Sequence, residues 1–331
     1  LKLVNAQIRK LAGFGVIFAL LVVSVGAYTR LADAGLGCPD WPGCYGFLTV
    51  PDQASEISTA EARYPGAPVE FAKAWWEMGH RYIAGALLLL VASILVIAYR
   101  AREKEDTPFK LAAVLMVVIL WQAAFGAWTV TLKLWPQVVT GHLIGGFTTL
   151  SLMWLLFLRQ GGLSDVVSAL PRPNWLAKLA FVAVVAQIIL GGWVSSNYAA
   201  LACYDFPSCD GTYTPDIDLQ QGFNIFQSVG PNYLGGLMTN EARMAIHWVH
   251  RIGAIVVLLV VGGLVFQTVK QVAVVGYALL AALVTQITLG ILNVVWVLPL
   301  LNATAHNTVG ALLLLVLVTI NFAPRLRIVQ S

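Results

Sequence analysis

The sequence predicts an all-α integral membrane protein with eight transmembrane helices, arranged as two pseudo-symmetric four-helix bundles. Three observations support this fold class: the composition, the recurrence of long apolar runs, and an internal duplication. Hydrophobic residues make up 59% of the 331 residues and charged residues only 11%, whereas a soluble domain usually carries about 25% charged residues. A chain with so little charge is expected to expose most of its surface to lipid.

Eight apolar runs are long enough to cross a bilayer, which requires about 20 residues in each helix. We expect helices over residues 11–29, 75–98, 109–130, 139–158, 177–197, 244–266, 271–296 and 304–322. Lys2, Arg9 and Lys10 precede the first run, but no small-residue cleavage site follows it. The first run is therefore predicted to remain as a helix and not to be a cleaved signal peptide.

The distribution of charge predicts the orientation, because Lys and Arg favour cytoplasmic loops. With the N-terminus inside, cytoplasmic segments hold 13 of the 20 basic residues: Lys2, Arg9, Lys10, Arg100, Arg102, Lys104, Lys110, Arg159, Arg172, Lys178, Lys270, Arg325 and Arg327. Of the 16 acidic residues, 12 lie outside, and the cytoplasmic ones are Glu103, Glu105, Asp106 and Asp165. We expect a multi-pass protein of a bacterial-type plasma (inner) membrane with both termini cytoplasmic.

The two halves of the chain, residues 1–160 and 161–331, repeat one pattern. The matched positions are Cys38 with Cys203, Cys44 with Cys209 and Gly26 with Gly191 (offset 165), His80 with His250 (offset 170), and Gln122 with Gln286 and His142 with His306 (offset 164). Each half has four helices and one long outer loop, roughly residues 30–74 and 198–243. An even number of helices makes the repeats parallel, with a pseudo-two-fold axis along the membrane normal, and short connections favour a four-helix bundle in each half.

Both pairs of cysteines lie in the long outer loops, within "GLGCPDWPGC" and "ACYDFPSCDG". Disulfides form and persist outside the cytoplasm. We therefore expect the bonds Cys38–Cys44 and Cys203–Cys209, each restricting one outer loop. A redox role for the first pair stays open, because an exposed disulfide can be labile.

The histidines are the candidate chemical groups. All five lie near the outer ends of even-numbered helices: His80, His142, His247, His250 and His306. A lone histidine at this depth is usually an interfacial side chain, but polar residues in a membrane that recur with the repeat are functional candidates. Diagonal helices of a bundle can aim two imidazoles at one axis, which suits the two axial ligands of a haem iron. We pair His80 with His142 and His250 with His306, and consider zinc a poorer match because its sites need more ligands.

Polar neighbours of these histidines have two interpretations each. Arg81 and Arg251 follow a histidine directly and are expected either to contact haem propionates or to reach lipid phosphate. Gln122 and Gln286 are expected to hydrogen-bond between helices of one bundle.

The halves differ three residues before the first histidine of each pair, where Glu77 corresponds to His247. Positions three apart share a helix face. Glu77 is either an interfacial acid paired with Arg81 or a catalytic group, acting as general base or as electrostatic stabiliser of positive charge on a substrate. His247 is an alternative ligand, although the shared His-Arg order favours His250. The asymmetry suggests that one bundle does chemistry and the other holds a permanent cofactor.

The chain resembles the haem A synthase family over nearly its whole length. The resemblance rests on "GAYTRLADAGLGCPDWPGC", "EMGHR", "TGH", "HWVHR" and "AHNTVG", in this order along the helices. It implies that residues 1–160 bind the substrate haem O through His80 and His142, with Glu77 as the catalytic glutamate. It implies that residues 161–331 hold haem B through His250 and His306, so that these four histidines bind haem iron. The implied reaction oxidises a ring methyl of haem O to a formyl group by successive hydroxylations, giving haem A for terminal oxidases.

The partners expected from this resemblance are haem O and haem A, the lipid bilayer, an electron acceptor outside the chain, and haem O synthase or oxidase assembly factors. The alternative is a di-haem membrane cytochrome b that passes electrons, for example from quinol. Electron transfer across the bilayer favours haems at both faces, whereas these histidines gather at one. A transporter would need broken helices and midplane charges, and a prenyltransferase would need Asp-rich magnesium motifs; the sequence favours neither. The net charge of +4 gives no indication of nucleic-acid binding.

Overall fold

The structure is a computed structural model that describes residues 2–104 and 106–326. Eight of its helices are long and apolar enough to span a membrane, which confirms the predicted fold class. These helices are α1 (Lys2–Leu31), α3 (Phe71–Arg100), α4 (Phe109–Thr131), α5 (Pro136–Arg159), α7 (Trp175–Ser196), α9 (Asn240–Gln271), α10 (Ala273–Val295) and α11 (Leu300–Phe322). Glu105 and Arg327, two of the charges used to predict orientation, lie outside the described residues.

Most of the helices extend beyond the predicted apolar runs. The sixth run was expected to begin at residue 244, whereas α9 begins at Asn240, where the Thr239 hydroxyl accepts a hydrogen bond from the Ala242 N–H (3.3 Å). Its end moves from residue 266 to Gln271, and α10 begins only at Ala273. Hydropathy detects the part of a helix that matches the hydrocarbon layer, so polar turns that continue the helix on either side are missed.

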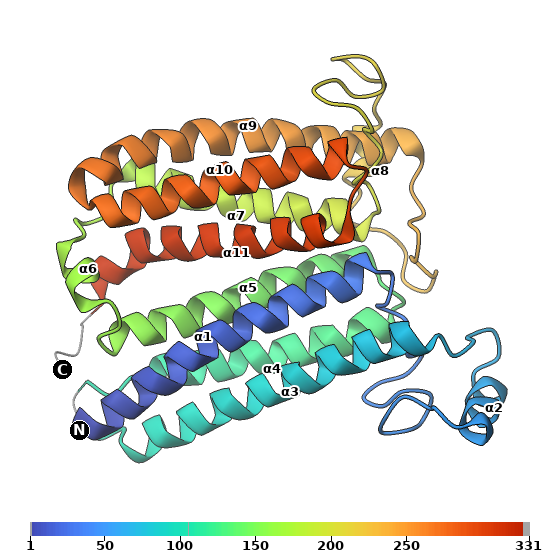
Figure 1. The fold of residues 1–331 in the computed structure, drawn as a ribbon, viewed down its shortest axis with the longest axis horizontal. Coiled ribbons are helices and arrows are strands. Elements are labelled where there is room, and N and C mark those ends of the chain that lie inside the picture. Colours follow the sequence, from blue (N-terminus) through green and yellow to red (C-terminus); the bar gives the residue numbers. More distant parts are fainter. Residues whose placement is uncertain (1, 105, 327–331) are drawn as a thin grey trace.

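The eight helices form two four-helix units that lie against each other (Figure 1). In the first unit α1 packs against α3 and α5, and α4 packs against the same two helices. In the second unit α7 packs against α9 and α11, and α10 packs against the same two. Helices α3 and α5 are therefore diagonal partners, as are α9 and α11. The units meet along α1, α5, α7 and α11.

Positions that correspond under the repeat touch each other where the units meet. Two hydrogen-bonded pairs join such positions at the offset of 165: the Arg30 guanidinium with the Ser195 carbonyl (2.6 Å) and the Tyr198 hydroxyl with Asp33 (3.1 Å). Between α5 and α11, where the offset is 164, the Trp154 indole donates to the Thr319 hydroxyl (2.7 Å), one residue past its counterpart. A residue meets its own counterpart only beside a two-fold axis. These contacts place a pseudo-two-fold axis along the interface between the units.

Both ends of the described chain lie at one end of the molecule, and the two long loops lie at the other (Figure 1). The loops carry short helices α2 (Ala54–Arg63) and α8 (Leu219–Gly222), while α6 (Ser164–Ala169) and the 3₁₀ turn η1 (Ala323–Arg325) lie toward the opposite end. The second loop crosses to the first unit, where Trp135 donates to the Gln227 carbonyl (3.1 Å) and Gln137 donates to the Ile225 carbonyl (2.8 Å). This end of the molecule therefore joins the two units by loop contacts as well as by helix packing.

Candidate functional site

Four histidines lie on the two diagonal helix pairs, at a similar depth below the long loops. His142 and His306 each stand six residues after the first residue of α5 and α11, or about 9 Å along the axis. His80 lies on α3, diagonal to α5, and His250 lies on α9, diagonal to α11. Each unit thus carries one of the two pairs that the sequence suggested, on its diagonal helices.

Each of these four rings packs against a glycine of a neighbouring helix. A β-carbon built on the glycine would lie close to the ring Cε1 in every case: Gly26 with His80 (2.7 Å), Gly290 with His306 (3.0 Å), Gly126 with His142 (3.3 Å) and Gly191 with His250 (3.3 Å). Contacts this short are tighter than ordinary carbon–carbon packing. The glycines therefore make room for the imidazoles, and the arrangement repeats in both units.

The hydrogen bonds of the rings differ between the units. In the second unit His306 Nδ1 lies 3.1 Å from the Gln286 carbonyl, and Gln187 Nε2 lies 3.1 Å from His250 Nδ1. In the first unit His80 Nδ1 is buried without a hydrogen-bond partner. Gln187 was not among the residues predicted from the sequence.

The amide of Gln122 contacts His142 in a different way. It donates to the His142 carbonyl (2.6 Å) and so joins α4 to α5, as expected for a link between helices. The ring of His142 lies near the Gln122 carbonyl, but its Nδ1 does not meet hydrogen-bond geometry. Both imidazoles of the first unit therefore lack a firm partner on Nδ1.

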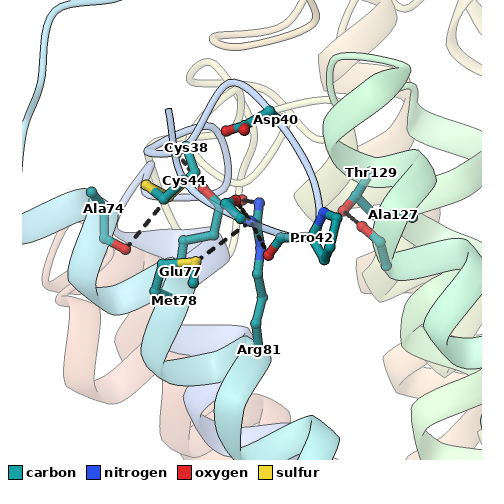
Figure 2. A network of polar contacts seen from close by, with 12 residues as sticks. Cys38, Asp40, Pro42, Cys44, Ala74, Glu77, Met78, Arg81, Ala127 and Thr129 are labelled. Carbon is teal, nitrogen blue, oxygen red and sulfur yellow. Dashed lines mark hydrogen bonds and ion pairs between the residues drawn. A yellow bond between two sulfur atoms is a disulfide. The ribbon is translucent and has the colours of Figure 1, made fainter. Parts of the chain in front are cut away.

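Glu77 lies one turn above His80 on α3 and is buried, with 5% of its surface exposed. One carboxylate oxygen accepts a hydrogen bond from the Cys38 N–H (2.9 Å), and the other forms an ion pair with Arg81 (Figure 2). Arg81 also donates to the Pro42 carbonyl (3.3 Å) and to the Gly43 carbonyl. Glu77 and Arg81 together hold the first cysteine loop against α3.

The second unit repeats this arrangement with a histidine in place of the glutamate. His247 is buried, and the Cys203 N–H (3.4 Å) and Arg251 Nε (3.3 Å) each approach one of its ring nitrogens. Arg251 also donates to carbonyls of the second cysteine loop, those of Ser208 (2.7 Å), Cys203 (2.8 Å) and Asp205 (2.9 Å). This clamp on the loop was not predicted for either arginine.

Both predicted disulfides are present, Cys38–Cys44 and Cys203–Cys209. Each loop is further folded by an aspartate between its cysteines. Asp205 accepts hydrogen bonds from the Ser208 hydroxyl and from the N–H groups of Asp210 (2.7 Å) and Gly211 (3.0 Å). Asp40 does the same in the first loop, accepting from Tyr45 (2.6 Å) and Gly46 (2.7 Å).

Two imidazoles from diagonal helices, each lodged against a glycine, suit the axial ligation of a haem iron. Zinc would need three or four ligands gathered at one point. The residues present therefore fit one haem in each unit.

Comparison with known proteins gives consistent matches along the chain. A family model described as COX15-CtaA, cytochrome oxidase assembly protein, matches residues 9–318. A heme A synthase of Shewanella oneidensis is 47% identical over 322 residues, which cover 96% of each chain. Heme A synthases of Chelativorans sp. and of Anaplasma marginale (strain Florida) are 28% and 26% identical, over 88% of this chain and 84% and 86% of theirs.

Proposed function

Because the chain belongs to the COX15-CtaA family, we propose that it is a membrane oxidoreductase that converts haem O to haem A. The main support for this proposal is that the chain is 47% identical, over 96% of both chains, to a protein named heme A synthase. The reaction oxidises a ring methyl to a formyl group by successive hydroxylations, the electrons pass to an acceptor outside the chain, and the product serves terminal oxidases.

The first unit is proposed to hold the substrate. His80 and His142 would bind the iron of haem O, and this iron supplies the redox chemistry. Glu77 is one helical turn from His80, and its buried carboxylate is stabilised by the ion pair with Arg81 and the hydrogen bond from the Cys38 N–H. The corresponding position of the second unit is a histidine, His247. A fixed carboxylate here stabilises positive charge that develops on the substrate. We assign Glu77 this role.

The second unit is proposed to hold haem B permanently, with His250 and His306 as ligands. Arg81 and Arg251 stand next to the ligands of the two sites and already donate to loop carbonyls. Guanidinium groups carry five N–H donors, so we propose that each arginine shares its donors between the loop and a haem propionate. The cysteine loop then covers the outer edge of each haem.

We propose that the end of the molecule with the two cysteine loops faces away from the cytoplasm. Both ends of the described chain lie at the opposite end, which also carries most of the basic residues, as the positive-inside rule requires. The two disulfides are consistent with an oxidising compartment.

The function is tested by extracting and separating the haems of purified protein from cells that make haem O. For Glu77→Gln we expect haem B and haem O but no haem A, because the site still binds haem and lacks the charge. Glu70→Gln, which removes an exposed acid at the start of the same helix, is the control and should give haem A. Unchanged haem A in Glu77→Gln would overturn the catalytic role.

A second arm of this experiment tests the cofactor site. His250→Ala and His306→Ala should each remove haem B selectively, and full haem B content in either variant would contradict the pairing. Wild-type protein that holds haem B alone when haem O is supplied would favour an electron-transfer cytochrome instead.

A further inference from the structure

The two units differ where a neighbouring helix faces the first histidine of each pair. On α7, the amide nitrogen of Gln187 lies 2.8 Å from the His250 carbonyl and 3.1 Å from its Nδ1. The amide occupies space opposite Gly253, where a β-carbon would come within 2.1 Å of Gln187 Oε1. Gln187 on α7 therefore fits against Gly253 on α9 beside the His250 ring, and we call these two residues the fitted pair.

The corresponding pair in the first unit is apolar. Gln187 stands four residues before Gly191, and Val22 stands four residues before Gly26; Gly253 and Ile83 both stand three residues after the histidine. Val22 is buried and Ile83 packs against the same apolar cluster. No amide can reach His80 from these positions, and its Nδ1 has no partner.

The presence of an amide beside His250 and its absence beside His80 affect the hydrogen bond that each ring can make through Nδ1. A neutral histidine that binds iron through Nε2 carries hydrogen on Nδ1, and a hydrogen-bond acceptor there fixes the ring and raises its basicity. His306 has such an acceptor in the Gln286 carbonyl (3.1 Å). Gln187 Oε1 is buried with no partner of its own, so rotation of the amide presents this oxygen to the Nδ1–H of an iron-bound His250.

We propose that Gln187 is a positioning residue that anchors the haem-binding ring of His250 and makes the second site the one that keeps its haem. Val22 and Ile83 leave His80 without such an anchor, so that the first site binds a haem that must enter and leave. This inference rests on the proposed function, which requires one resident haem and one exchanging haem. It adds Gln187 as the residue that makes one site retain its haem while the other exchanges it.

The test uses the purified full-length protein loaded with haem B. We measure the rate at which haem passes to excess apomyoglobin, and the midpoint potential of the bound haem. Gln187→Val should lose haem about tenfold faster or more and should shift the potential upward, because a ligand without an acceptor on Nδ1 stabilises the ferric iron less. Wild-type values of both quantities in Gln187→Val would overturn the proposal.

A second variant separates positioning from general destabilisation. Gln187→Glu keeps an acceptor at the same reach and makes it stronger, so its potential should shift below that of the wild type. A purely structural role for Gln187 predicts that the Val and Glu variants shift the potential in the same direction. That result would also overturn the proposal.

The reciprocal exchange tests the first site. Val22→Gln combined with Ile83→Gly gives α1 and α3 the fitted pair of the second unit, and should slow the transfer of haem O to apomyoglobin about tenfold. Haem B content in the same sample reports that the variant is folded. An unchanged transfer rate in a variant with full haem B content would contradict the inference.

The outcomes for the inference and for the function are distinct. Haem B release is measured without haem O and without turnover. If the wild type makes no haem A from haem O, the proposed function fails whatever Gln187 does. If Gln187→Val keeps haem B like the wild type in a protein that makes haem A, the inference alone fails.

Discussion

Substitution of Gly26 by alanine tests whether the glycine under the His80 ring is required for the substrate site. The added β-carbon would lie 2.7 Å from His80 Cε1. Carbon atoms that are not bonded to each other pack at about 3.5 Å or more, so the ring has to move by roughly 0.8 Å. Catalytic and binding groups tolerate displacements of only about 0.5 Å. We therefore expect Gly26→Ala to lose most of its haem O and haem A.

The protein itself should remain folded. Overpacking of this kind costs about 1–3 kcal/mol, and replacement of a helical glycine by alanine returns about 0.5–1 kcal/mol. The net loss of about 2.5 kcal/mol or less should leave the haem B of the second unit in place. Haem extraction and chromatography report both haems in one sample.

The matched control is Gly85→Ala on α3, where an added β-carbon meets nothing within 4 Å. This variant should keep wild-type amounts of both haems. Gly191→Ala brings the β-carbon to 3.3 Å from the His250 ring and should reduce haem B only mildly. Normal haem O binding by Gly26→Ala would refute the reasoning, because it would mean that the ring position is not set by this contact.

Three further predictions concern the outer end of the molecule. Replacing Cys38 and Cys44 together by serine should lower stability by about 2 kcal/mol, as expected for a short disulfide loop; lost turnover in stable, haem-loaded protein would instead indicate a redox role. The Ser208 hydroxyl and backbone N–H groups lower the pKa of Asp205. The stabilisation of the loop by ionised Asp205 is therefore complete above the unfolded pKa of about 4, and it is lost as the pH falls through the lower folded pKa. We expect the wild-type loop to become more sensitive to proteolysis over this acid range, and we expect the sensitivity of Asp205→Asn not to change with pH there. Arg30→Met should lower thermal stability by about 2 kcal/mol, because it loses the hydrogen bond to the Ser195 carbonyl and the contact with the Tyr198 ring; an unchanged melting temperature would argue that the bond contributes nothing.

The sequence predicted the membrane helices well because each contains an apolar run that no soluble helix needs. It did not predict α2 (Ala54–Arg63), which has only ten residues and little apolar character, although Gln53 and Glu56 form a capping box that could have marked its start. The ends of α9 were also misplaced, since Asn240 and Gln271 extend the helix beyond the apolar segment.

Local spacing identified the histidines and Glu77, but it could not show what their neighbours contact. Arg81 and Arg251 reach carbonyls about 40 residues away in sequence, and such contacts depend on how a loop folds back. Gln187 was missed for a different reason. Its signal lies in the comparison of Val22 with Gln187 once Gly26 and Gly191 are aligned, which requires reading the repeat for its differences as well as its matches.

The contacts between repeat-related positions have a consequence for the origin of the two sites. Their arrangement is that of a symmetric homodimer whose subunits have been joined into one chain. Beside the axis of a true homodimer each residue meets its own copy, so an arginine would face an arginine. Once the copies are fused, Arg30 can face the carbonyl of Ser195 and the ring of Tyr198. The same fusion allows one bundle to acquire a glutamate and the other a glutamine beside the ligand histidine, a division of labour that identical subunits cannot make.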